Sequence, residues 1–259
     1  MRRRKIRSLY FSFRKVSVCV RFSGDGVRWY NFAKKIFGGF DLRKQNILEK
    51  QDAEVRHKRK KKLFVVSSSS FVDFWKIYKR LTRYIVRKTL LSEREKLAFI
   101  HASAVYNRRK IYIILGKSGF GKSTACKILL QKGFGYISDD TVIIDVKKKV
   151  LVVFPKPIEI KSAKGIKIYP VYDVNKEIKI GRKKIAFIIL KRQIKSEKDY
   201  RDFVSIFRNT PEIHLEKLQA VDGVLMVLRN TANLRNLDES SYLKIISRSS
   251  NDFYLLRKI

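Results

Sequence analysis

Cysteine, proline and long apolar stretches are scarce in this chain of 259 residues. Its only two cysteines, Cys19 and Cys126, exclude a fold built on a disulfide framework and favour a reducing compartment. Four prolines and twelve glycines exclude collagen-like and proline-rich classes. No apolar run approaches the roughly 20 residues that a membrane-spanning helix needs. Arg7 and Arg14 interrupt the first apolar stretch, so we expect no secretory signal and a cytoplasmic location.

Acidic residues are also scarce, since 23 aspartates and glutamates stand against 60 lysines and arginines. The formal net charge is +37 at pH 7. One interpretation is an acidic partner, such as RNA, DNA, an anionic membrane surface or an acidic peptide. The alternative is a lysine-rich composition whose charges lie on solvated faces. The basic runs at 2–5 and 56–62 are where the chain could follow a line of phosphates.

The N-terminal part of the chain has the patterns of a small β-rich module. Residues 16–22 and 63–66 have the pattern of strands, and residues 23–26 are typical of a turn. Over 71–99, apolar residues recur at intervals of three and four, which predicts a helix with a basic outer face. Such a helix either links domains with its charges in water or binds a membrane or nucleic acid. We expect this module and its helix to span residues 1–95.

After residue 94 the pattern becomes that of an α/β domain, which we expect to span residues 96–259. Helices are expected at 123–131, 201–207 and 215–228. Strand-like runs lie at 98–105, 110–115, 141–145, 150–154, 158–161 and 185–190.

A glycine-rich segment stands between the apolar run at 111–115 and the helix expected at 123–131. It satisfies the Gly-x-x-x-x-Gly-Lys-Ser/Thr pattern of phosphate-binding loops. Glycines let successive backbone N–H groups point at phosphate oxygens, and the following helix N-terminus adds partial positive charge. The lysine can reach the β- and γ-phosphates, and the first hydroxyl can ligand Mg²⁺. We therefore predict that ATP is bound by Gly116, Lys117, Ser118, Gly119, Phe120, Gly121, Lys122, Ser123 and Thr124.

Two adjacent carboxylates, Asp139 and Asp140, lie between a glycine-containing turn and an apolar strand. One can hold Mg²⁺, and the other can accept the proton of an attacking hydroxyl. The alternative is a capping or turn pair without chemistry. His101 opens the strand before the loop strand, where a histidine is either structural or part of the site.

Together these segments resemble the nucleotide-binding domain of HPr kinase/phosphorylase and its relatives, which share a phosphoenolpyruvate-carboxykinase-like fold. The resemblance implies that Asp139 is the base acting on a serine hydroxyl. It also implies that Asp140 and Ser123 bind the metal and that His101 lies against the reacting phosphate. The residues that carry the resemblance are His101-Ala-Ser-Ala-Val, the phosphate loop, Lys132-Gly133 and Ser138-Asp139-Asp140.

The resemblance is closer to peptide-modifying kinases than to HPr kinase itself. Lys161 stands where HPr kinases carry an arginine in a downstream signature, and lysine cannot replace a bidentate arginine without loss. The segment at 154–157 is more similar to relatives in peptide-modification clusters, such as the kinases that phosphorylate lasso-peptide precursors.

The sequence therefore predicts a Mg²⁺- and ATP-dependent kinase that transfers the γ-phosphoryl group to a hydroxyl. The first candidate for the acceptor is a serine of a peptide or protein. In this interpretation Lys122 stabilises charge and Asp139 activates the nucleophile. A kinase acting on an RNA hydroxyl or a small-molecule alcohol is an alternative, and a nucleotide-dependent RNA-binding protein is another. The charge predicts an acidic or phosphate-rich substrate. A homo-oligomer is compatible with the sequence.

Overall fold

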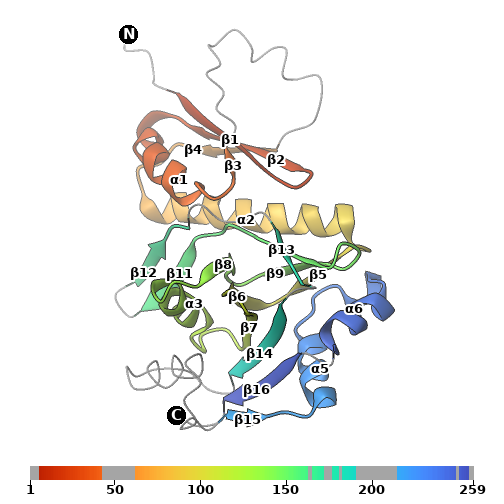
Figure 1. Cartoon of the computed structure of the whole chain (residues 1–259). Coiled ribbons are helices and arrows are strands. Elements are labelled where there is room, and N and C mark those ends of the chain that lie inside the picture. Colours follow the sequence, from red (N-terminus) through yellow and green to blue (C-terminus); the bar gives the residue numbers. More distant parts are fainter. Residues whose placement is uncertain are drawn as a thin grey trace, which may run out of the picture. The chain divides into compact units, whose positions relative to one another are not determined.

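The computed structural model describes residues 6–42, 62–162, 165–171, 177–180, 183–190, 215–248 and 251–256 (Figure 1). The basic run at 2–5, the run at 56–62 except its last residue, and the helix expected at 201–207 lie outside the described residues. The chain divides into two compact units, Met1–Ser92 and Glu93–Ile259, and each is described by itself. No described helix combines the length and the hydropathy needed to cross a membrane.

The elements of the first unit are, in chain order, β1 (Arg7–Phe13), β2 (Val16–Phe22), η1 (Gly24–Trp29), α1 (Tyr30–Ile36), β3 (Asp41–Leu42), β4 (Lys62–Val66) and α2 (Phe71–Glu93). The strands form one sheet in the order β3–β1–β2–β4, in which β1 and β2 are an antiparallel hairpin and β4 is parallel to β2. The expected strands at 16–22 and 63–66 are thus confirmed. The turn expected at 23–26 instead begins the 3-10 helix η1, which continues directly into α1.

Helix α2 confirms the helical period, although it ends at Glu93 rather than near residue 99. The middle of its apolar face is buried at Phe74, Trp75, Tyr78, Leu81 and Ile85, whereas Phe71 at its start is exposed. Trp75 stacks on Tyr78 with ring centroids 4.5 Å apart. Phe74 stacks on Trp29, which joins η1 to the helix. The predicted basic face is exposed at Arg80, Arg83, Arg87 and Lys88.

The second unit contains fifteen further strands and helices among its described residues, together with the short 3-10 helix η4. They are β5 (Leu97–Ile100), β6 (Ala102–Tyr106), β7 (Lys110–Gly116), α3 (Lys122–Gln131), β8 (Gly135–Ser138), β9 (Val142–Asp145), β10 (Val150–Val152), β11 (Ile158–Ser162), β12 (Gly165–Tyr169), β13 (Glu177–Lys179), β14 (Lys184–Leu190), β15 (Leu215–Lys217), α5 (Ala220–Arg229), η4 (Leu234–Asn236), α6 (Glu239–Ile246) and β16 (Asp252–Leu256).

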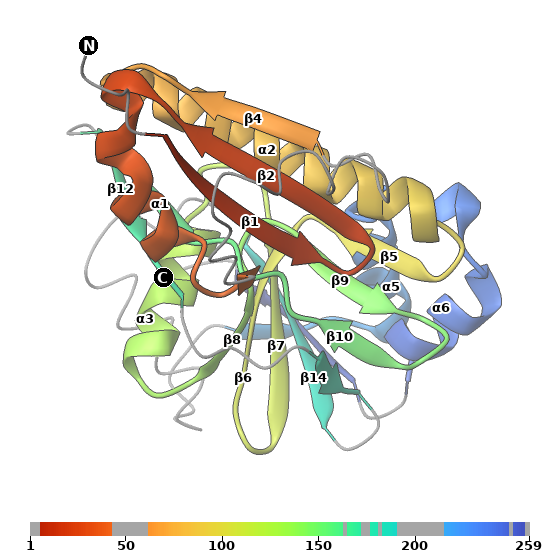
Figure 2. The same ribbon diagram turned by 90° about the horizontal axis from the view of Figure 1, so that it is seen from above.

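A six-stranded mixed sheet forms the centre of this unit, in the order β15–β16–β14–β7–β6–β8. Strands β7, β14 and β16 are parallel, whereas β6 is antiparallel to both β7 and β8. Figure 2 shows β6, β7 and β14 running side by side. A second sheet has the order β13–β10–β9–β5, and β11 pairs with β12. The α/β class expected for this part of the chain is confirmed.

The sheet places the ends of three segments close together. Strand β7 leads into the glycine-rich loop and α3, and β8 leads into the aspartate pair. Strand β6 lies between β7 and β8, so its N-terminal end is adjacent to both exits. Residues at 101–103, 116–123 and 138–140 therefore meet at one edge of the sheet.

Two further expectations, both about the second unit, were wrong. The run at 98–105 forms two strands in different sheets, β5 and β6, because the chain breaks at His101, whose N–H donates to the Asn230 carbonyl at 2.9 Å. Of the helix expected at 215–228, only α5 exists, since the first residues form β15 and pair with the sheet strand β16. Strands β1, β3, β8, β12, β13 and β16 and helices α1 and α6 were not anticipated.

Candidate active site

The glycine-rich loop joins β7 to α3 and has the local geometry that its glycines allow. Gly121 is the N-cap of α3 and has φ of 95°, a left-handed conformation that favours glycine. A Cβ at Gly116 would lie 3.0 Å from the Leu190 Cβ and 3.2 Å from its carbonyl oxygen, so this position adjoins β14 too closely for a side chain. Within the loop, the Phe120 N–H donates to the Lys117 carbonyl at 3.2 Å.

The N-terminus of α3 is suited to an anion. Its N-cap is a glycine, which has no side chain to accept from the first N–H groups, and its first turn contains no acidic residue. The partial positive charge of the helix therefore faces the loop without a carboxylate to offset it. Lys117, Ser118 and Gly119 are exposed, whereas Phe120, Ser123 and Thr124 are half-buried.

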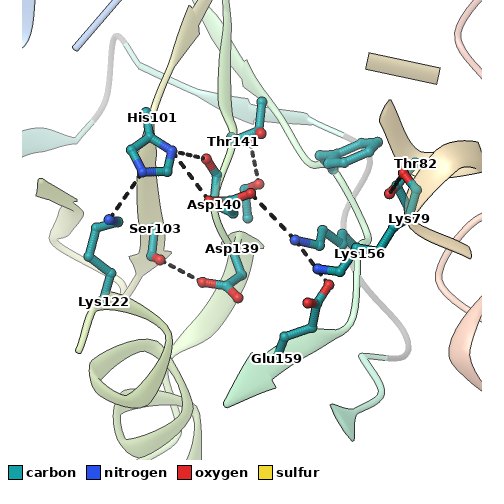
Figure 3. Close-up of polar contacts among 12 residues, drawn as sticks. Lys79, Thr82, His101, Ser103, Lys122, Asp139, Asp140, Thr141, Lys156 and Glu159 are labelled. Atoms are coloured by element: carbon teal, nitrogen blue, oxygen red, sulfur yellow. Dashed lines mark hydrogen bonds and ion pairs between the residues drawn. The ribbon is translucent and has the colours of Figure 1, made fainter. Parts of the chain in front are cut away.

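Lys122 lies at one end of the cluster in Figure 3, beside His101, with only 7% of the residue exposed. Its Nζ donates to the carbonyls of Gly116 at 2.6 Å and Lys117 at 3.2 Å, and it lies 3.3 Å from the Nε2 of His101. Burial lowers the pKa of Lys122, although the charges of Asp140 and Asp139 oppose this effect. The ammonium thus lies at the loop, near the aspartate pair.

His101 connects Lys122 to the aspartates. Because an ammonium only donates, Nε2 of His101 is the acceptor and Nδ1 carries the proton. Nδ1 then donates to the Asp140 carbonyl at 3.1 Å, and it lies 3.3 Å from Oδ1 of the same residue. The histidine predicted from the sequence is therefore part of the same cluster as the loop lysine.

Asp139 is buried, with 1% of the residue exposed. It accepts a hydrogen bond from the Ser103 hydroxyl at 2.6 Å. Burial raises the pKa of Asp139, in spite of the opposing charge of Lys156 and the Ser103 hydroxyl. The bond from Ser103 joins the buried aspartate to β6.

Asp140 differs from its neighbour in exposure and in backbone conformation. Its side chain is 51% exposed, and its φ of 76° lies in the left-handed region, which aspartate tolerates better than most residues. The Ser138 hydroxyl donates to the Thr141 carbonyl and closes the turn around the pair. The Asp140 carboxylate lies between His101 and a second lysine, Lys156.

Lys156 was not among the predicted site residues. Its side chain is 9% exposed, and its Nζ lies 3.5 Å from Asp140 Oδ2 and 3.2 Å from Glu159 Oε1 (Figure 3). Burial lowers the pKa of Lys156, but the charges of Glu159, Asp140 and Asp139 outweigh that effect and raise it. The available signal was a lysine between two prolines at 155 and 157, which the sequence analysis used only for the resemblance.

The donor atoms of the site fit a magnesium nucleotide better than a metal held by protein alone. Among the described residues, no group of three histidine, cysteine or acidic side chains is placed to hold a metal. Mg²⁺ in phosphoryl-transfer sites usually takes one or two carboxylates, waters and the substrate phosphates. The Asp140 carboxylate and the Ser123 hydroxyl are oxygen ligands of that kind.

No protein-family model matches this chain, and no curated protein matches it.

Proposed function

We propose that the protein is a Mg²⁺- and ATP-dependent kinase that transfers the γ-phosphoryl group to a hydroxyl, with serine of a peptide or protein as the acceptor. One observation carries the proposal. The lysine of the glycine-rich loop, His101 and the aspartate pair form a continuous cluster beside the uncapped N-terminus of α3. The proposal includes a phosphate-binding-loop domain of the HPr kinase type, which the sequence resembles.

Each part of the cluster has a role in this reaction. The loop N–H groups, the α3 N-terminus and Lys122 bind the phosphates and stabilise the charge that develops on them. Ser123 and Asp140 would hold Mg²⁺, which neutralises phosphate charge when it is bound. His101 lies beside Lys122 and orients it toward the loop.

Asp139 takes the proton of the acceptor hydroxyl. As the acceptor oxygen forms its bond to the γ-phosphorus, the bond from that phosphorus to the β–γ bridging oxygen breaks and ADP leaves. The raised pKa of Asp139 suits a base, because proton transfer is efficient when the pKa lies nearer the working pH. Asp140 is the second candidate for this role, since its carboxylate is half-exposed and Asp139 is buried.

The excess of basic residues supports an acidic or phosphate-rich acceptor. An acidic peptide fits a chain with 60 basic and 23 acidic residues, and its binding should weaken strongly with salt. The same charge favours an RNA hydroxyl as the second candidate acceptor, and the exposed basic face of α2 is a surface that could follow phosphates.

The experiment is to incubate the protein with γ-labelled ATP, Mg²⁺ and cell extract, and then to separate protein, RNA and small metabolites. Label in the protein fraction that is lost in Asp139→Asn or Lys122→Met supports the proposal. Lys148→Met, which removes an exposed lysine with a partner in Glu177, is the matched control and should keep transfer. Label in RNA would favour the second acceptor. RNA binding without transfer to any fraction would contradict the kinase proposal.

A further inference from the structure

Lys156 belongs to the cluster at the aspartate pair but has no role in the reaction described above. We propose that Lys156 is a positioning residue of this site, which fixes the Asp140 carboxylate while Glu159 fixes Lys156. This inference rests on the proposed kinase function and adds a residue to it.

The backbone around Lys156 is tied to the strand that carries the aspartates. The Phe154 N–H donates to the Ile137 carbonyl of β8 at 3.0 Å. The Tyr136 hydroxyl, also on β8, donates to the Lys156 carbonyl at 2.6 Å. Because β8 ends immediately before Asp139, these bonds hold the lysine backbone in register with the pair. Buried prolines on both sides of Lys156 restrict the same segment further.

The side-chain contacts are those of a residue that organises charge. A buried lysine is costly unless it is paired, and Glu159, with a side chain only 6% exposed, supplies that pair at 3.2 Å. One carboxylate would satisfy one ammonium. The second contact, 3.5 Å to Asp140 Oδ2, is not needed for neutrality and links the buried pair to the reacting centre.

The contacts of the Asp140 carboxylate come from two sides. Nδ1 of His101 lies 3.3 Å from Oδ1, and Nζ of Lys156 lies 3.5 Å from Oδ2. Each carboxylate oxygen therefore has its own partner, and together the two partners fix the orientation of the group. If Lys156 positions this carboxylate, its loss must lower the rate of the folded enzyme, and arginine, which keeps the charge, must restore most of that rate.

The test uses water as the acceptor, so that no substrate has to be identified. The Mg²⁺-dependent hydrolysis of ATP is measured at a series of ATP concentrations for the full-length wild type, Lys156→Met and Lys156→Arg, and the thermal unfolding of each protein is measured beside it. Lys156→Met is expected to lower kcat about 10- to 100-fold, as loss of a supporting partner does in metal-assisted sites. It should leave KM for ATP close to that of wild type, because the contact of Lys156 is to Asp140 rather than to the loop that binds phosphates. Lys156→Arg, which keeps the charge, should restore most of kcat.

Further variants separate positioning from a structural effect. The double variant Lys156→Met/Glu159→Gln removes both buried charges, so it avoids an unpaired glutamate and should fold, yet it should show the same loss of kcat. Lys148→Met should behave as wild type. A purely structural lysine would change the unfolding temperature but leave kcat and KM of the folded enzyme unchanged.

Two negative outcomes are distinguishable. An active wild type whose Lys156→Met variant keeps kcat overturns this inference and leaves the kinase proposal standing. A wild type whose hydrolysis does not exceed that of Lys122→Met overturns the kinase proposal, and the inference falls with it.

Discussion

Replacing Asp139 by asparagine should make the protein more stable and inactive at the same time. The change conserves shape, and the Ser103 hydroxyl, now 2.6 Å from Oδ1, can donate to the amide oxygen instead. Burial raises the pKa of Asp139, so the folded protein binds this proton more tightly than the unfolded chain does. As pH rises from the ordinary value of 3.8 through the raised folded pKa, wild-type stability falls. Asp139→Asn does not lose stability in this way, because asparagine does not ionise.

The size of the effect follows from two opposing changes. A hydrogen bond to a charged acceptor contributes about 1.5–3 kcal/mol and one to a neutral acceptor about 0.5–1.5, so asparagine loses about 1 kcal/mol at Ser103. Removing a buried charge relieves a penalty of several kcal/mol, part of which Lys156 already offsets. Because the pKa of Asp139 is raised, the cost of burying its charge exceeds the stabilisation that Lys156 and the hydrogen bonds give to that charge. We expect a net gain of about 1 kcal/mol near pH 7, or about 2–4 °C in Tm.

The assay is thermal unfolding over a series of pH values, combined with label transfer from ATP. The gain of Asp139→Asn over wild type should be full at neutral pH and vanish as pH falls to the ordinary aspartate range. Transfer should fall about 10²- to 10⁴-fold, as expected for loss of a general base. Asp145→Asn, at another buried aspartate, is the control and should keep transfer. A variant less stable than wild type at neutral pH, or one that keeps full activity, would refute the reasoning.

Two further predictions concern packing and thiol reactivity. Gly223→Ala should destabilise the protein by about 1–2 kcal/mol in chemical denaturation, because the new Cβ would lie 2.2 Å from Phe253 Cγ. This clash outweighs the gain in helix propensity, which is about 1 kcal/mol, and a stabilised variant would contradict it. Cys126 should resist alkylation in the native state near pH 8, because burial and the charge of Asp139 raise its pKa well above 9.0. It should react once denaturant is added, and rapid native labelling of Cys126 would contradict the burial.

The elements that sequence reasoning predicted are those with a local signal. Helix α2 has an apolar face of regular period, and β7 and α3 flank a loop whose glycines and lysine are consecutive. The break at His101 was missed because β5 and β6 are both almost wholly buried, so no alternation of polar residues marks where one ends. Strand β15 was expected to be helical, since its pairing with β16 is a distant contact that no short pattern reveals.

In the site, too, the residues with a local sequence signal could be predicted, and those placed by distant contacts could not. The loop and the aspartate pair are short motifs, so their residues could be named from the sequence. Lys156 could not, because its role depends on the fold bringing segment 154–157 against β8 and the aspartate turn. The unequal exposure of the two aspartates is likewise a consequence of packing: Asp139 is buried beside Ser103 on β6, and Asp140 projects from the turn.

Titration calorimetry with a phosphate series tests the central claim most directly. If the loop and the α3 N-terminus bind phosphates, affinity in the presence of Mg²⁺ should be high for ATP, lower for ADP and very low for AMP. Lys122→Met should weaken ATP binding at least about tenfold, since hydrogen bonds to charged groups contribute about 1.5–3 kcal/mol. Lys148→Met should leave it unchanged. Equal affinity for ATP and AMP, or an ATP affinity that Lys122→Met leaves intact, would contradict the account.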